Sequence, residues 1–271
     1  KQIIKKPKTE SVVKLNNNVF IVPKKKPQSY KKIAKAAKKS KYLGQKDFDK
    51  AKLAFDQIRS GKWITGYKTS KKMKDKEFKK FVKWLYLLKT GNNASFNDYQ
   101  LFISNNPDYP RIGRLRYLAE QKIYLKNTTP KNIIFWFENY PPVSGTGKLK
   151  LAESLIANNQ KENTTNLVKE GWIDAALSKS ELRFYRKKFK SILDSDDHIK
   201  RADYLAWERK YWDLKRMLRY LPKDQKALYN ARQILMSNSY GVDNAISKVP
   251  NHFKKDIGLQ YDRLRWRNRR G

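Results

Sequence analysis

The sequence predicts an all-α fold in which short antiparallel helix pairs stack into an irregular superhelix, an α-solenoid. Three observations predict it. Apolar residues recur at helical spacing along most of the chain. No run shows the strict apolar–polar alternation of a half-buried strand, and no Asn-Gly or Asp-Gly pair marks a tight hairpin. Helix-start patterns and weak internal repeats recur through the second half of the chain.

The composition points to an anionic partner. The 271 residues include 62 Lys and Arg against 25 Asp and Glu, a formal net charge of +37. A charge of this size is typical of proteins that bind nucleic acid, acidic lipid or an acidic polymer such as peptidoglycan. The many Lys and Asn residues are also typical of a genome biased towards AAA and AAT codons, so the charge has two explanations.

The composition also excludes several kinds of site. The chain has no cysteine, which excludes disulfides and thiolate-bound metals. No apolar run approaches the roughly 20 residues of a membrane-spanning helix, so we expect no membrane span.

The chain divides into three predicted segments. Residues 1–27 form an extended basic leader, because prolines stand among lysines there and too few residues are apolar to bury a core. Residues 28–109 form N-terminal helical hairpins that include a lysine-rich stretch. Residues 110–271 form the superhelical domain.

Two helices are predicted within residues 28–109. The first is rich in alanine and leucine and ends at Gly61. A basic stretch, Lys68–Lys80, then leads into an aromatic amphipathic helix that closes at Gly91. The second helix is either a buried stripe with a solvated lysine face or an aromatic, basic surface for a polymer, and periodicity does not separate the two. Its apolar residues are Phe78, Phe81, Val82, Trp84, Leu85 and Leu88.

Helix-start chemistry recurs after Pro110. Thr129–Pro130 has the residues preferred at an N-cap and in a first helical turn. Ser178 and Glu181 have the spacing of a capping box. Asp194–Asp197 places acidic residues where the positive end of a helix favours them.

A weak internal repeat predicts stacked helix pairs. A shift of fifty residues aligns Ala152, Leu155, Leu167 and Val168 with Ala202, Leu205, Met217 and Leu218. A shift of 28 aligns Leu214, Leu218, Leu221 and Pro222 with Val242, Ile246, Val249 and Pro250. Small residues would let two helices approach closely, and large apolar residues would fill the returning helix. This is the organisation of a tetratricopeptide-like solenoid.

Two motifs resemble ligand sites but are predicted to be structural. Ser144–Lys148 matches part of a phosphate-binding loop, yet Pro142 and Leu149 replace the Gly and the Ser or Thr that the full pattern needs. We interpret it as the start of a helix. Asp194–Asp197 with His198 matches no metal-binding loop and is interpreted as helix capping. The other histidine, His252, is far away in sequence, so no metal or cofactor site is predicted.

Glu153 and Ser154 form a Glu-Ser pair of the kind that opens the active-site pattern of glycan-cleaving domains of the lysozyme type. A catalytic Glu of this kind needs a cleft that raises its pKa. Here helical periodicity predicts that Glu153 faces outward, and no Gly-Leu-Met-Gln follows it. We therefore predict no catalytic residue in the chain.

Several segments resemble, in order, the N-terminal superhelical (U-shaped) domain of soluble lytic murein transglycosylases. They are Trp136–Pro142 with Gly145 and Gly147, Leu167–Trp172, Asp197–Trp207, Arg216–Leu218 and Gly258–Arg267. The resemblance implies a periplasmic protein directed at peptidoglycan. It also implies a parent enzyme that cleaves between N-acetylmuramic acid and N-acetylglucosamine and leaves a 1,6-anhydromuramoyl end. The family's catalytic Glu lies in a C-terminal domain. The resemblance therefore implies that residues 110–271 stop before the catalytic domain and that no catalytic residue is carried over to this chain.

The preferred function is a non-catalytic, substrate-guiding scaffold whose partners are peptidoglycan strands and the catalytic domain of the same enzyme. Two alternatives stay open. A basic helical-repeat protein would bind nucleic acid through Lys71–Lys80 and Arg263–Arg270, although no base-reading motif is present. A tetratricopeptide-like adaptor would bind other proteins.

Overall fold

The computed structural model describes residues 12–15, 18–21, 40–160, 162, 164–237 and 240–270. The chain forms two compact units, residues 1–83 and 84–271, and each is described by itself. Most of the predicted leader, and the alanines at positions 34, 36 and 37, lie outside the described residues. The predicted boundaries at residues 27 and 109 stay predictions.

Two short strands precede the helices. Strands β1 (Val12–Leu15) and β2 (Asn18–Ile21) pair antiparallel, with Val12 opposite Ile21 and Leu15 opposite Asn18. The sequence analysis predicted an extended leader without a sheet. Four residues per strand are too few for an alternation to be recognised, although Val, Ile and Phe favour strands.

The all-α prediction is confirmed from residue 45 onward, where the described residues contain no strand. In the first unit, α2 (Gln45–Arg59) packs against α3 (Trp63–Lys71), and α4 (Lys76–Leu88) begins. The chain leaves α2 through Gly61, whose φ of +81° favours glycine, as predicted.

The buried Asp47 side chain joins the start of α2 to the turn before α4. Its Oδ2 accepts hydrogen bonds from the backbone N–H groups of Lys74 (2.8 Å) and Asp75 (2.7 Å). These donors hold the pKa of Asp47 below its usual value. Phe55 and Phe78 pack edge to face with ring centroids 5.5 Å apart, which supports the buried-stripe interpretation of α4.

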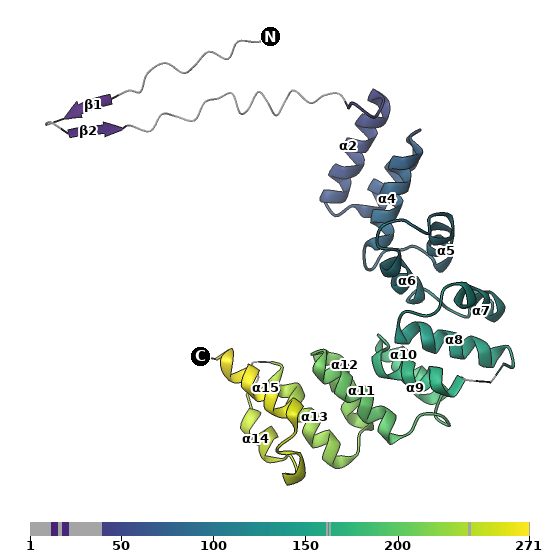
Figure 1. Cartoon of the computed structure of the whole chain (residues 1–271), viewed down its shortest axis with the longest axis vertical. Coiled ribbons are helices and arrows are strands. Elements are labelled where there is room, and N and C mark those ends of the chain that lie inside the picture. The colour runs from purple at the N-terminus through teal and green to yellow at the C-terminus, as the bar shows by residue number, and fades with distance from the viewer. Residues whose placement is uncertain are drawn as a thin grey trace. The chain divides into compact units, whose positions relative to one another are not determined.

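The second unit is a series of short helices (Figure 1). They are α5 (Phe96–Asn105), α6 (Ile112–Glu120), α7 (Pro130–Asn139), α8 (Gly145–Ala157), α9 (Thr164–Asp174), α10 (Lys179–Lys188), α11 (Ser195–Trp207), α12 (Tyr211–Met217) with the 3-10 turn η1 (Leu218–Tyr220), α13 (Lys223–Leu235), α14 (Val242–Ser247), the 3-10 turn η2 (Asn251–Phe253) and α15 (Ile257–Asn268).

Helices of the second unit pack mainly against their neighbours in sequence. Helix α8 packs on α7 and α9, α11 packs on α9, α12 and α13, and α13 packs on α14 and α15. A continuous apolar core runs through these helices from Leu149 to Leu259. The shift of fifty residues maps the bounds of α8 onto those of α11, and Ala152 and Ala202 are both fully buried.

The predicted helix starts are confirmed. The Thr129 hydroxyl accepts from the backbone N–H of Asn132, and Pro130 is the first residue of α7. Ser178 with Glu181, and Asp194 with Asp197, form reciprocal capping boxes at the starts of α10 and α11. Each box satisfies backbone donors that the first helical turn leaves unpaired.

Candidate functional site

The Ser144–Lys148 motif is the start of a helix, as predicted, and the anion beside it is the carboxylate of Glu120. The Ser144 hydroxyl oxygen accepts from the N–H of Gly147 at 3.1 Å. The Glu120 carboxylate accepts from the N–H of Val143 at 2.7 Å and from the Ser144 hydroxyl. Burial raises the pKa of Glu120, and these donors act in the opposite direction. The Glu120 carboxylate and the Ser144 hydroxyl therefore satisfy donors at the start of α8 from within the chain.

The prediction that Glu153 faces outward is wrong. Its side chain is buried, because α10 covers this face of α8. The Tyr185 hydroxyl donates to Glu153 Oε2 at 2.9 Å, and Lys188 Nζ lies 3.2 Å from Oε1. Both carboxylate oxygens are engaged in this helix–helix contact, so Glu153 does not open onto a catalytic cleft.

Lys150 lies one turn before Glu153 and is also buried. Its ammonium lies 4.8 Å from the centroid of the Tyr124 ring, 5.4 Å from that of Tyr185 and 3.9 Å from Glu181. Burial lowers the pKa of Lys150, and the two nearby glutamates act in the opposite direction. Burial also raises the pKa of Tyr185. Sequence analysis missed this cluster, because its members come from separate helices and loops.

The acids at the start of α11 cap the helix and bind a lysine. Lys169 Nζ lies 2.7 Å from Asp194 and 3.1 Å from Asp197. His198 instead packs against Trp172, with ring centroids 5.4 Å apart. Across the described ranges, no group of three or more His, Asp or Glu side chains is placed to hold a metal ion.

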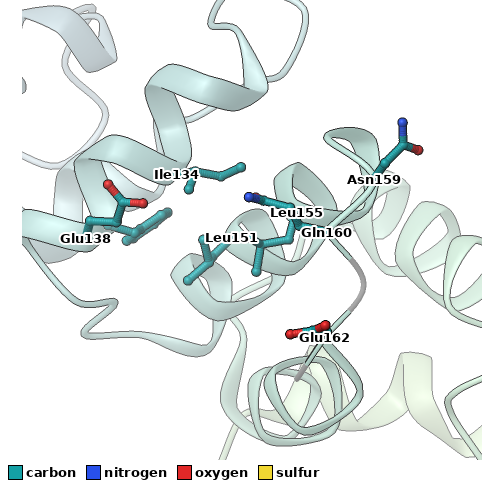
Figure 2. Close-up of a pocket in the computed structure, with 8 residues that line it drawn as sticks. Ile134, Glu138, Leu151, Leu155, Asn159, Gln160 and Glu162 are labelled. Atoms are coloured by element: carbon teal, nitrogen blue, oxygen red, sulfur yellow. The ribbon is translucent and has the colours of Figure 1, made fainter.

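One hollow of about 550 Å³ lies beside α7 and α8 (Figure 2). Its apolar lining consists of Ile134, Phe137, Leu151 and Leu155. Its polar lining consists of Glu138, Asn159, Gln160 and Glu162. An apolar wall with two carboxylates suits a ligand with small apolar groups and an ammonium or amide donor, such as a short peptide. Sequence analysis did not predict this hollow. Of its lining residues, Phe137 and Glu138 lie in Trp136–Pro142, one of the segments that resemble the transglycosylase family.

Both signs of charge occur at the surface and in the interior of the described part of the chain. Glu120, Asp197 and Asp262 are buried, whereas Glu77, Glu138 and Glu170 are exposed. Positive groups outnumber negative ones, and many are exposed, including Lys71 and Lys72 in the predicted basic stretch and Arg265, Arg267 and Arg269 at the end of α15. The exposed surface is therefore strongly cationic.

Exposed aromatic side chains accompany the arginines of α15. Trp207 and Tyr261 are 45% and 43% exposed, with ring centroids 5.5 Å apart. The Arg265 guanidinium lies 5.5 Å from the centroid of the Tyr261 ring. Aromatic rings beside cations form a surface on which planar groups can stack.

No described helix is long and apolar enough to cross a membrane. Compared with known proteins, the chain matches no protein-family model, no curated protein and no solved structure.

Proposed function

We propose that this chain is a non-catalytic helical scaffold that binds peptidoglycan and guides it to the active site of a soluble lytic transglycosylase. The parent enzyme would act in the periplasm and cleave the bond between N-acetylmuramic acid and N-acetylglucosamine, forming the 1,6-anhydromuramoyl product. Its catalytic Glu would lie in a separate domain. The helices would stack as an irregular, tetratricopeptide-like superhelix.

The excess of positive charge carries this proposal. The chain has a net charge of +37, and many of its lysines and arginines are exposed among the described residues. Such a surface attracts the carboxylates of peptidoglycan stem peptides over distances up to a screening length, about 8 Å at physiological salt.

The family-like segments support the choice of polymer. Several of their apolar residues occupy core positions, since Trp136, Trp172, Ala202, Leu205 and Leu259 are all buried, whereas Trp207 and Leu264 are exposed. A shift of fifty residues maps α8 onto α11, and it maps α9 onto residues 214–224, which overlap α12 and η1 in part. The match of α8 with α11 supports stacked helix pairs. Both carboxylate oxygens of Glu153 are bound, by Tyr185 and Lys188. This agrees with a proposal in which another domain of the parent enzyme cleaves the glycan.

Sedimentation with isolated peptidoglycan sacculi tests the proposal. We expect the purified chain to sediment with sacculi at low salt and to be released at roughly 0.5 M salt, where the screening length falls to a few ångströms. Retention on duplex DNA at physiological salt, without affinity for sacculi, would contradict it.

The arginines and aromatics of α15 favour a second candidate, a nucleic-acid-binding protein. Tyr261 and Trp207 could stack bases while Arg265 neutralises phosphate. In that case, affinity for single-stranded oligonucleotides would fall steeply with salt, and Tyr261→Ala with Trp207→Ala would weaken it roughly tenfold or more.

A further inference from the structure

Two adjoining hollows lie beside α5 and α6, in the loops that follow α4 and α6. The first, of about 380 Å³, is lined by Lys89, Thr90, Gly91, Tyr99, Arg114, Tyr117, Leu118, Gln121, Lys122 and Tyr124. The second, of about 450 Å³, is lined by residues 92–97 with Lys122, Tyr124, Asn127 and Thr128. Lys122 and Tyr124 line both hollows, so the two are neighbours, and together they are here called the Tyr124 groove.

The walls of the Tyr124 groove are held in place by internal bonds. Lys122 Nζ donates to the carbonyl of Asn92 at 2.6 Å and ties one loop to the other. The buried Asn92 amide donates to the carbonyl of Lys89 and to the Tyr99 hydroxyl, each at 2.8 Å. The Tyr99 hydroxyl in turn donates to the carbonyl of Leu87 at 2.7 Å. The groove is therefore preformed, which lowers the conformational entropy that its loops would lose when a ligand binds.

The second hollow is poor in charge for this chain. Lys122 is the one cation in its lining, and its ammonium is already bonded to Asn92. The lining instead offers the amides of Asn93, Asn97 and Asn127, whose side chains make no hydrogen bond to other described residues. Amides that both donate and accept match the hydroxyl and acetamido groups of an uncharged sugar better than they match phosphate.

The first hollow adds positive charge. Lys89 and Arg114 line it, so a carboxylate next to the sugar would be favoured there.

Tyr124 stands between the hollows. Its ring is 47% exposed, although Lys150 Nζ lies 4.8 Å from the ring centroid. An exposed aromatic ring flanked by amides is a platform on which the apolar face of a pyranose can rest.

We propose that the Tyr124 groove is a saccharide subsite that takes an N-acetylated hexosamine in its neutral hollow and a carboxylate substituent in its cationic hollow. This inference rests on the proposed function, because it identifies the part of the scaffold that holds the glycan. The amides of Asn97 and Asn127 bond the sugar, and Tyr124 stacks against it.

Calorimetric titration with the tetramer of N-acetylglucosamine tests the neutral hollow. We expect the full chain to bind this uncharged probe with an affinity that salt leaves unchanged between roughly 0.05 and 0.5 M, because screening acts on charges alone. Tyr124→Ala should weaken binding roughly fivefold to a hundredfold, the range for loss of an aromatic stacking platform. Asn97→Ala should weaken it at least threefold.

Two control variants match these changes. Tyr42 is 93% exposed and lies outside the groove, and Asn105 is an exposed residue on the same helix as Asn97. Tyr42→Ala and Asn105→Ala should bind the tetramer like the unmodified chain. Circular dichroism checks that each variant is folded.

The outcomes separate this inference from the proposed function. Co-sedimentation with sacculi without tetramer binding, or equal tetramer binding by Tyr124→Ala, overturns the saccharide subsite and leaves the scaffold function standing. Failure to bind either sacculi or the tetramer overturns both. Loss of single-stranded RNA binding in Tyr124→Ala, without tetramer binding, would assign the groove to nucleic acid.

Discussion

At the scale of single residues, buried guanidinium groups join helices of the second unit. Arg201 donates to the carbonyls of Trp172 (2.5 Å) and Ala175 (2.8 Å), where the end of α9 favours a cation. Arg232 lies between Asp203 (2.8 Å) and Asp262 (2.9 Å), which come from α11 and α15. Burial raises the pKa of Asp262, and Arg232 acts in the opposite direction.

Replacing Arg232 should therefore be costly. We expect Arg232→Met to lower the free energy of unfolding by about 3–5 kcal/mol, because the buried Asp262 would lose its hydrogen-bonded partner and keep the more distant Arg209, 3.9 Å away. Asp262→Asn in the same chain should restore part of this loss. Urea unfolding measures both effects, with the exposed Arg267→Met on α15 as a control that should stay within about 0.5 kcal/mol. A small effect at Arg232 would mean that Asp262 has another source of compensation.

Asp194 should confer stability that depends on pH. The Lys169 ammonium lowers the pKa of this carboxyl from 3.8 to about 2. Because the pKa of Asp194 is lower in the folded state than in the unfolded state, its ionised form stabilises the fold. This contribution is complete above about pH 4 and is lost as the pH falls through about 2. We expect Asp194→Asn, which can still cap α11, to have a lower Tm than the unmodified chain at pH 6.

The difference in Tm should disappear near pH 2. It should also shrink in a Lys169→Met background, as a thermodynamic double-mutant cycle would reveal. A difference that is constant from pH 6 to pH 2 would show that capping, rather than the ion pair, is the source of the effect.

At the scale of elements, α8 and α9 meet through two glycines. A Cβ atom on Gly171 would lie 2.9 Å from the carbonyl oxygen of Gly145 and 2.9 Å from Lys148 Cβ. A Cβ atom on Gly145 would lie 2.6 Å from the backbone nitrogen of Ala175. The small residues therefore permit a close helix crossing that any side chain would push apart.

We expect Gly171→Ala to lower the free energy of unfolding by about 1–3 kcal/mol, as overpacking does. Gly113→Ala is the matched control, because Gly113 lies in α6 and a Cβ atom added to it would meet no other atom within 4 Å. This control should raise stability by up to about 1 kcal/mol, since alanine is the better helix former. Thermal and urea unfolding compare the two, and equal effects would contradict the close crossing.

At the scale of the whole molecule, the helices from α8 to α15 share one apolar core, and many lysines and arginines are exposed. Leu205 and Leu218 belong to this core, from α11 and the following turn η1. We expect Leu205→Ala and Leu218→Ala to cost about 2–5 kcal/mol each. Lys71→Ala and Lys72→Ala, at exposed sites, should stay within about 0.5 kcal/mol. Similar small effects at all four positions would contradict the assignment of the core.

The chain alone should release no anhydromuropeptides from peptidoglycan. Glu153, the carboxylate of the Glu-Ser pair in α8, is bonded to Tyr185 and Lys188 inside a helix contact. We expect Glu153→Gln to change stability and not to change product release, which chromatography of digested sacculi measures as zero for both chains. Release that Glu153→Gln abolishes would overturn the scaffold function.

The sequence by itself determined the helix starts at Thr129, Ser178 and Asp194, and the recurrence of small and large apolar residues between α8–α9 and α11–α12. These features depend on chemistry within a few residues of the chain, which a sequence displays directly. Only the tertiary structure shows that Glu153 and Lys150 are buried. Helical periodicity defines the faces of a helix, but it does not show which other helix covers each face. The tertiary structure also decided the Tyr124 groove, whose lining comes from α5, α6 and two loops about thirty residues apart, which a Lys122 bond to Asn92 holds together.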